Sequence, residues 1–570
     1  MDNQLPKPLI IIISLIQGIL LTLIYRSVEN DVWPSTAPVW LVSLTTFVVV
    51  FPLLFLLVVT KKNALHAVKY LLSFTLLLSF LGAYVGFQQE PVEYVSNWVV
   101  VAVFSFTALI ACFKALIYIQ LRLSKESVTY SALFKTSWRN FIIFAESWLF
   151  VLIFWGILHL GSSLFLVLKI DVFQQLLKED WFVIPVLTLA FGFATLIFRN
   201  IVDTVDNIAT ILQTLIKFLL PALTIVSLGF LSTLPFAGLD NLWETGKGSL
   251  LVMWLQALTL FFVNAVYQGA SNHRPYHNIL HRIIFIGIAL LPIYSVISAY
   301  GLWLRIDQYG LSIDRCWAVL VCFILSCFSI GYLAGIINKR DAWLTVLSKV
   351  NIAMSLVILS IVLLVNTPLL NFQSIVASSQ LSRLDNGDVT KDNFDYHYFG
   401  QQLGRQGYLA MQVLKETLKD THPEKVIVID RMYTNVKVQS KETVTQVEFE
   451  QEATFWPSRN AFSEEFIQTI YRTETEHKWS NVKKNSYYFL AIDLNGDGGN
   501  NFIVIKENNH STSGQLWQKN NNRWDSLYMN SDNPEKIKYL KNLVLANEVN
   551  VKERKWKTLQ IGDLTFKVAN

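Results

Sequence analysis

Charged residues are scarce in the first 370 positions of this 570-residue chain. That part holds 22 Lys and Arg and 17 Asp and Glu, whereas residues 371–570 hold 25 of each kind in only 200 positions. An ordinary soluble domain has about 25% charged residues, so the second part resembles one and the first is too apolar for water. The contrast excludes a wholly soluble enzyme, a disordered chain and a nucleic-acid-binding protein. It predicts a membrane protein with a soluble tail.

Cysteine and catalytic motifs are also rare or missing. The soluble tail contains no cysteine, so its fold owes nothing to disulfides, and the other cysteines all lie in apolar runs: Cys112, Cys316, Cys322 and Cys327. The sequence lacks the phosphate-binding G-x-x-x-x-G-K-[ST], G-x-S-x-G and H-E-x-x-H patterns. Nothing therefore indicates a nucleotide-driven pump or a known hydrolase, and we assign no catalytic residue and no certain cofactor.

Long apolar runs dominate what is present. A bilayer core needs about 20 apolar residues of helix, and the sequence contains eleven such runs. We predict an α-helical polytopic membrane bundle over 1–370, a linker and helix over 371–420, and an extracytoplasmic α+β domain over 421–570. The predicted spans are about 8–25, 38–60, 68–87, 97–121, 140–170 (long enough to tilt, or to break near Gly156 and Gly161), 181–198, 208–233, 249–268, 282–304, 316–337 and 350–369.

The orientation follows from lysine and arginine between the spans, because these residues are enriched on the cytoplasmic side. With the N-terminus inside, the inner segments hold fourteen of them: Lys7, Lys61, Lys62, Lys69, Arg122, Lys125, Lys135, Arg139, Arg199, Arg274, Arg282, Lys339, Arg340 and Lys349. The outer segments hold six: Arg26, Lys169, Lys178, Lys247, Arg305 and Arg315. Eleven spans from an inner N-terminus place the tail outside.

The tail mixes helical and strand-like patterns. Apolar residues at helical spacing predict a helix over about 394–419, which ends before Pro423. The α+β prediction rests on the segments after it. We expect strands at 426–429, 445–450, 487–494 and 502–506, hairpins at 515–528 and 557–568, and helices near 461–473 and 534–545.

Charged residues within predicted spans are candidates for function because they are costly there. Lys114, Glu146 and Lys217 all lie about 9–13 Å from the predicted inner ends of their spans. Consecutive antiparallel helices usually touch, so we predict an ion pair between Lys114 and Glu146, with Lys217 extending towards the inner surface. The alternative is a substrate or proton site.

Two segments could hold a metal ion. His273, His277 and His281 have the spacing of one helical face, but a proline interrupts them and no carboxylate or cysteine lies beside them. We therefore predict a basic loop at the lipid surface, and a metal site is the alternative. In the tail, Asp493, Asn495 and Asp497 have the D-x-N-x-D-G order of calcium loops. We predict a weak Ca²⁺ site there, and the alternative is an ordinary hairpin turn.

Two stretches resemble a known family. One runs from Leu291 to Trp317, and its most specific part is L-R-I-D-Q-Y-G-L-S-I-D-R at 304–315. The other comprises S-R-L at 382–384, D-Y-H-Y from Asp395, and L-G-R-Q-G-Y from Leu403. Together they are similar to bacterial multi-pass membrane proteins catalogued as domain of unknown function 4153, over about residues 60–415. The resemblance supports the membrane architecture and implies no activity. In a bacterial inner membrane, the outer side on which the charge count places the tail is the periplasm.

The first of these stretches forms an outer-loop motif with four notable residues, Arg305, Tyr309, Gly310 and Arg315. Gly310 suits a turn with positive φ. The two arginines could bind lipid phosphates. They could equally bond the loop's own carboxylates or carbonyls, or the tail, and we predict such a clamp for at least one of them.

Three functions remain open from the sequence. The first is an inner-membrane scaffold or sensor that presents a periplasmic domain, and its expected contacts are membrane lipids. The second is a transporter or lipid-handling protein with a polar pathway near Lys114, Glu146 and Lys217. The third is an intramembrane enzyme that acts on a lipid-linked substrate. A closed bundle favours the first, and a buried hydrophilic cavity that reaches one face favours the others.

Overall fold

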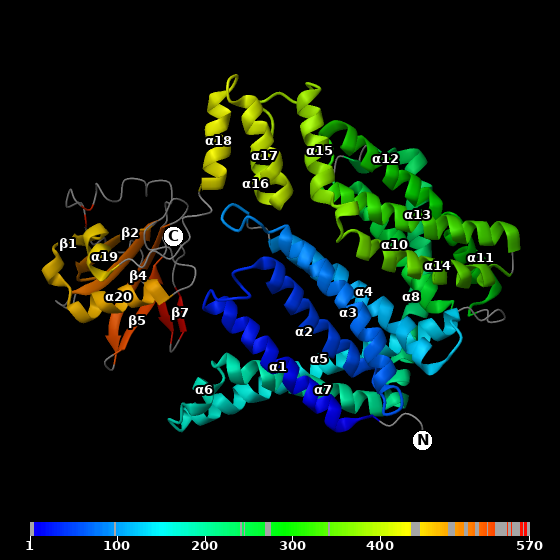
Figure 1. The fold of residues 1–570 in the computed structure, drawn as a ribbon, viewed down its shortest axis with the longest axis horizontal. Helices are drawn as coiled ribbons and strands as arrows, with labels where there is room; N and C mark the ends of the chain where they lie inside the picture. Colours follow the sequence, from blue (N-terminus) through cyan, green and yellow to red (C-terminus); the bar gives the residue numbers. More distant parts are fainter. Residues whose placement is uncertain are drawn as a thin grey trace. The chain divides into compact units, whose positions relative to one another are not determined.

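The fold is that of a computed structural model, which describes residues 5–529 apart from 96–97, 240–241, 244–245, 268–274, 340–341, 435–444, 477–484, 495–499, 508–511 and 521–522. Beyond 529 it describes residues 544, 549, 559–561 and 564–566. The chain divides into two compact units, Met1–Lys437 and Val438–Asn570 (Figure 1). Each unit has hydrophobic cores of its own.

Eleven spans of the first unit, counted over the described residues, are long and apolar enough to cross a membrane, which confirms the predicted helical bundle. Their exposed apolar faces suit contact with lipid, because within a bilayer the hydrophobic effect does not drive apolar side chains into the protein interior. The spanning helices are α1 (Lys7–Glu29), α2 (Pro38–Val58), α3 (Ala64–Phe87), α4 (Trp98–Ser124), α5 (Tyr130–Val167), α7 (Asp180–Asn200), α8 (Val202–Ala237), α10 (Gly248–Val266), α11 (Asn278–Ala289) with α12 (Leu291–Tyr309), α13 (Ile313–Lys339) and α14 (Trp343–Leu364).

Two spans differ in their continuity. Helix α5 is unbroken through Gly156 and Gly161, and its extra length continues before the predicted span. The ninth span is divided between α11 and α12 at Leu290, two residues before Pro292 in the first turn of α12. Proline has no N–H to continue a helical ladder, but its fixed φ suits the first turn of a new helix.

The helices of the first unit surround three large cores and a small one between α4 and α5. One large core lies among α1–α5 and α7, with the start of α8 and the end of α14, and a second lies among α8 and α10–α14. A third joins the start of α13 to the helices that follow the last span (Figure 1). The short elements outside the spans are α6 (Val172–Leu176), η2 (Pro368–Leu370), α15 (Phe372–Asp385), α16 (Tyr396–Gln402), α17 (Gly404–Leu418) and α18 (Pro423–Thr434).

The predicted strands at 426–429 and 445–450 are wrong, because both segments are helical. Pro423 begins α18 and does not merely follow the preceding helix, which is divided into α16 and α17. Ile429 and Tyr433 of α18 are buried in the third core at helical spacing. Thr445 caps α19 (Gln446–Glu452) in a capping box with Glu448. The pattern T-x-x-E was visible in the sequence. The capping box favoured a helix more strongly than the β-branched residues favoured a strand.

The second unit is built on a sheet with the order β1-β2-β3-β4-β5, which confirms the C-terminal α+β domain. Strand β1 pairs with β2 in parallel, and the later pairs are antiparallel. Side chains alternate along β2, so Tyr487 and Phe489 join the aromatic core beneath α20, while Tyr488 and Leu490 face the other side. The elements are α19, β1 (Thr454–Trp456), η4 (Arg459–Ala461), α20 (Glu464–Glu476), β2 (Ser486–Ile492), β3 (Asn501–Glu507), β4 (Thr512–Asn520), β5 (Arg523–Met529), and a separate pair β6 (Leu559–Ile561) and β7 (Leu564–Phe566).

Acid is expected to destabilise this unit through Glu450. Burial alone would raise the pKa of this carboxyl, but Arg459 Nε donates to Glu450 Oε2 over 2.8 Å, and with Gln446 it holds the pKa below its usual value. A lowered folded-state pKa means that stability is present above the unfolded value of about 4.3 and is lost as pH falls through the folded value. Hydrogen exchange of α19 and η4 across this pH range measures the loss. In Arg459→Met the acid dependence is expected to shrink, and an unchanged dependence contradicts this assignment.

Candidate functional site

The outer-loop motif forms a tight turn between α12 and α13. Gly310 ends α12 with φ +72° and ψ −172°, a conformation that only glycine adopts readily. A Cβ at this position would lie 2.7 Å from Cδ of Arg383 and 2.9 Å from Nε2 of Gln380. The glycine therefore permits both the turn and the close approach of α15.

Three arginines converge on this turn. Arg315 Nη1 donates to Gly310 O over 2.6 Å, so the predicted bond to a carbonyl of this loop is confirmed. Arg383 Nη2 donates to Gln308 O over 3.0 Å, and Arg305 Nη2 donates to Trp243 O over 3.1 Å. The guanidinium carbons of Arg305 and Arg315 lie 5.9 and 5.4 Å from the centre of the Tyr309 ring, which places both at cation–π distance. We call Arg305, Arg315 and Arg383 the arginine cluster.

No carboxylate neutralises the arginine cluster within the part of the chain that the structure describes. Asp307 in the last turn of α12 and Asp314 in the first turn of α13 flank the turn, but both are exposed, and neither forms an ion pair with a described residue. The three arginine residues are partly buried, and their side-chain hydrogen bonds go to backbone carbonyls. The site therefore keeps an excess of positive charge.

The second family stretch attaches α16 and α17 to the loop after α3. Arg405 donates to the carbonyl of Glu90 over 2.9 Å and lies over the Phe87 ring at 4.1 Å. The rings of Tyr94 and Tyr408 stack at 5.4 Å, and Asp395 caps α16. Both stretches that carry the family resemblance thus hold the post-span helices against the ends of spanning helices.

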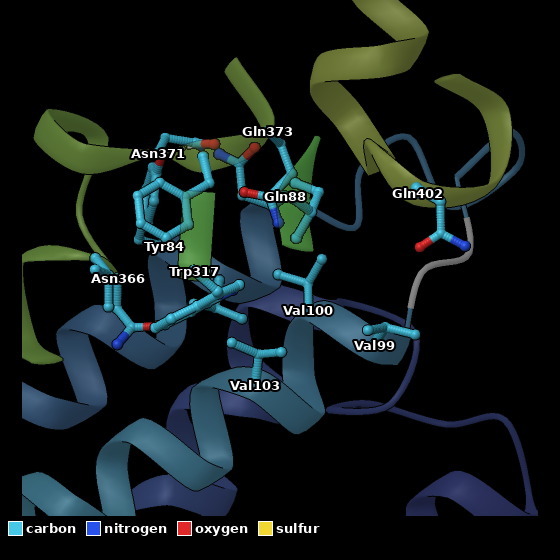
Figure 2. Close-up of a pocket in the computed structure, with 14 residues that line it drawn as sticks. Tyr84, Gln88, Val99, Val100, Val103, Trp317, Asn366, Asn371, Gln373 and Gln402 are labelled. Carbon is cyan, nitrogen blue, oxygen red and sulfur yellow. Dashed lines mark hydrogen bonds between the residues drawn. The ribbon is translucent and has the colours of Figure 1, made fainter. Parts of the chain in front are cut away.

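A pocket lies beside this attachment and beside the start of α13 (Figure 2). Its empty space is about 610 Å³ when the open solvent at its mouth is counted, and no charged residue lines it. Val100 and Val103 of α4 lie opposite Asn371 and Gln373 in Figure 2. The lining residues are Tyr84, Val85, Gln88, Val99, Val100, Val103, Ile313, Trp317, Val365, Asn366, Asn371, Phe372, Gln373 and Gln402.

Several amides of the pocket are already bonded, which fixes its shape. Asn371 Nδ2 donates to the Tyr84 hydroxyl over 2.7 Å, and Gln406 Nε2 donates to Gln88 Oε1 over 2.9 Å. The side-chain amide of Gln373, by contrast, has no hydrogen-bond partner among the described residues. The pocket thus combines fixed aromatic and apolar walls with one unused amide.

The predicted ion pair between Lys114 and Glu146 is wrong for the described part of the chain, where neither side chain forms an ion pair. Glu146 Oε2 is buried without a hydrogen-bond partner among the described residues. Lys217 contributes its backbone carbonyl to Tyr276 over 2.6 Å. Equal depth in the membrane was not enough to bring the Lys114 and Glu146 side chains together. Depth does not determine how each helix is rotated about its own axis. Among the described residues, no ion pair or hydrogen bond joins the side chains of Lys114, Glu146 and Lys217.

The predicted calcium site and the alternative metal site at the histidines receive no support from the described residues, which contain no cluster of potential ligands. His273 lies outside them, His277 precedes α11, and His281 Nδ1 lies 3.2 Å from the Tyr267 hydroxyl. Asp493 follows β2, whereas Asn495 and Asp497 lie outside the described residues. Because β2 and β3 are antiparallel, the segment does connect the strands of a hairpin.

Calcium binding by Asp493, Asn495 and Asp497 stays a prediction. Extracytoplasmic modules often bind Ca²⁺ with Kd of about 10⁻⁴–10⁻³ M. Ca²⁺ at about ten times Kd should stabilise the second unit by about 1.4 kcal/mol. Hydrogen exchange of β2 and β3 in the full chain measures this, with Mg²⁺ as the control. Asp497→Ala should abolish the protection. Equal protection of β2 and β3 from hydrogen exchange with and without Ca²⁺ would contradict the calcium site and show that the segment is an ordinary hairpin turn.

The sequence analysis missed two contributors to the site. Arg383 belongs to the quoted S-R-L stretch, and that was the available signal, but nothing local to it predicts contact with the turn at Gly310. Gln380 donates to the carbonyls of Tyr309 and Leu311 over 3.2 and 2.6 Å, and no motif contained it. Both contacts depend on how α15 packs, which spacing along the chain does not reveal.

The comparisons with known proteins agree with the sequence resemblance. A family model described as "Domain of unknown function (DUF4153)" matches residues 36–414, which is about two thirds of the chain. The match begins before the expected residue 60 and includes α2, and it ends within α17. It covers both the arginine cluster and the pocket. No curated protein and no solved structure is significantly similar to the chain.

Proposed function

The chain belongs to the DUF4153 family, and from this premise we propose that it is an inner-membrane sensor that presents its second unit in the periplasm. Its apolar helices make it a multi-pass membrane protein. The single observation that carries the sensing role is the composition of the pocket wall. Spanning helices α3, α4 and α13 provide one part, and Asn371, Phe372 and Gln373 at the start of α15 provide another.

In a pocket built in this way, a bound ligand would affect how the helices after the last span pack. A ligand that contacts Val103 and Gln373 together would change how α15 packs on the spans, and α15 belongs to the segment through which the chain continues to the second unit. A ligand shifts such an equilibrium only by its differential affinity for the two arrangements. The unused Gln373 amide is the group through which that difference would arise.

The chemistry of the pocket favours an uncharged ligand with polar groups. Trp317 and Tyr84 offer ring surfaces, Gln373 offers an amide, and no lining side chain is charged. A charged ligand would lose its hydration in this pocket without gaining a counter-charge. We therefore infer a neutral, hydroxyl- or amide-bearing ligand.

The interior of the bundle supports a sensor over a transporter. Gln256 Nε2 donates to Ser295 Oγ and Ser329 Oγ, both over 2.7 Å, which joins α10, α12 and α13. Asn351 Nδ2 donates to Asn264 Oδ1 over 2.6 Å. Hydrogen bonds of this kind between helices hold a bundle closed in lipid, and Gln256 Oε1 is left buried without a hydrogen-bond partner among the described residues.

The coupling is testable by filling the pocket. In Val103→Phe the added ring occupies the space beside α15, and hydrogen exchange of residues 372–402 should rise in the purified full-length protein. Ala102→Phe is the matched control, because Ala102 is exposed on the same helix and does not line the pocket. Equal exchange in the wild type and in Val103→Phe would contradict the sensing role.

A further inference from the structure

We propose that the arginine cluster is a binding site for a phosphate group at the membrane surface, distinct from the uncharged pocket. Arg305, Arg315 and Arg383 come from α12, α13 and α15 and meet at one turn. The phosphate could belong to a phospholipid headgroup or to a soluble phosphate ester. The geometry favours the headgroup.

The first argument is unused donor capacity. A guanidinium group has several N–H donors in a rigid fork that matches the oxygens of a phosphate. In the described part of the chain, each of the three groups makes one hydrogen bond, always to a backbone carbonyl. Those carbonyls orient the forks without cancelling their charge, so the donors that remain are preorganised for an anion.

The second argument is charge. Three cations held around one turn repel one another, and an arrangement without a counter-ion costs free energy. Asp307 and Asp314 are near in sequence, yet no described carboxylate pairs with the cluster. The Tyr309 ring lies within cation–π distance of Arg305 and Arg315 and provides only a weak attraction. A bound phosphate would supply the missing negative charge.

The third argument is position. The turn joins the end of one span to the start of the next, so it lies at a membrane surface in either orientation of the chain. On α12, Val296, Tyr300 and Trp303 have exposed fractions of 68%, 46% and 59%, which gives this helix an apolar face for acyl chains. A phospholipid beside α12 would carry its phosphate at the level of the turn.

The test measures lipid retention by the full-length protein in a non-ionic detergent, using native mass spectrometry. The probes are phosphatidylglycerol, a neutral glucosyl diacylglycerol without phosphate, and soluble glycerol phosphate. The test variant combines Arg305→Gln with Arg383→Gln and leaves Arg315 in place, because that residue bonds the turn itself. The control is Arg26→Gln, which removes an exposed arginine at the end of α1. A variant with lysine at positions 305 and 383 keeps the charge.

We expect wild type and Arg26→Gln to retain phosphatidylglycerol in preference to the glucosyl lipid. The double glutamine variant should bind phosphatidylglycerol about tenfold more weakly, since one charge-assisted hydrogen bond is worth about that factor. The lysine variant should recover part of the binding. Cluster-dependent binding of glycerol phosphate without lipid retention would assign the site to a soluble ester. If the double variant elutes as a folded monomer and retains each probe as the wild type does, the proposal is overturned.

Discussion

Replacing Gly86 with leucine is expected to destabilise the membrane bundle by about 3 kcal/mol or more. Gly86 lies where α3 packs against the start of α2. A Cβ there would lie 2.7 Å from Cα of Val39 and would also contact the Pro38 carbonyl. Both neighbours are backbone atoms, so a rotamer change cannot relieve the overlap, and the two helices must separate.

The measurement is thermal unfolding of the purified full-length protein in detergent. Gly156→Leu is a matched control, because a Cβ at Gly156 meets nothing within 4 Å and the residue lies on an exposed face of α5. The control should unfold close to the wild-type temperature. Equal unfolding temperatures for both variants would show that the α2–α3 contact is not tight.

Replacing Arg199 with methionine is the second change with a large expected effect. Arg199, near the end of α7, donates from Nη1 to Leu56 O over 2.5 Å and from Nη2 to Val59 O over 2.8 Å. These carbonyls lie at the C-terminal end of α2. Backbone carbonyls at a helix C-terminus have no partner within the helix, and they form the negative end of the helix dipole. Leu56 and Val59 are both fully buried, so the carbonyls cannot turn to water.

We expect a loss of about 3 kcal/mol, because hydrogen bonds to a charged group contribute about 1.5–3 kcal/mol each. Thermal unfolding in detergent again provides the readout. Arg199→Lys should recover part of the loss by retaining one cation. Arg122→Met is the control, since Arg122 is an exposed arginine at the end of α4. If Arg122→Met and Arg199→Met destabilise the protein equally, the cap is not important.

Hydropathy predicted the spans well because crossing a bilayer requires a fixed length of apolar helix. The same logic could not locate contacts between spans. The sequence indicates only that Arg199 is a positive residue between two spans. In the structure it caps a helix more than a hundred positions away. The Lys114–Glu146 pair failed for the same reason, since hydropathy sets depth and not rotation.

The tail was predicted less well where local signals competed. The alternation along β2 and β3 produced correct strands because one face of each packs under α20. The segment after Pro423 has a β-branched apolar run, but its residues at helical spacing pack into the third core as α18. The candidate site was likewise predicted only in part. The sequence indicated Arg305, Gly310 and Arg315, whereas Arg383 and the pocket depend on the packing of α15.

The central claim is that the membrane bundle presents the second unit outside the cytoplasm, and reporter fusions test it most directly. Alkaline phosphatase is active only outside the cytoplasm, and a fluorescent protein reports the inner side. The charge distribution between spans predicts fluorescence without phosphatase activity for fusions after Lys62 and Lys125. It predicts phosphatase activity without fluorescence for a fusion after Asn570. Phosphatase activity at either of the first two positions, or its absence after Asn570, would contradict the account.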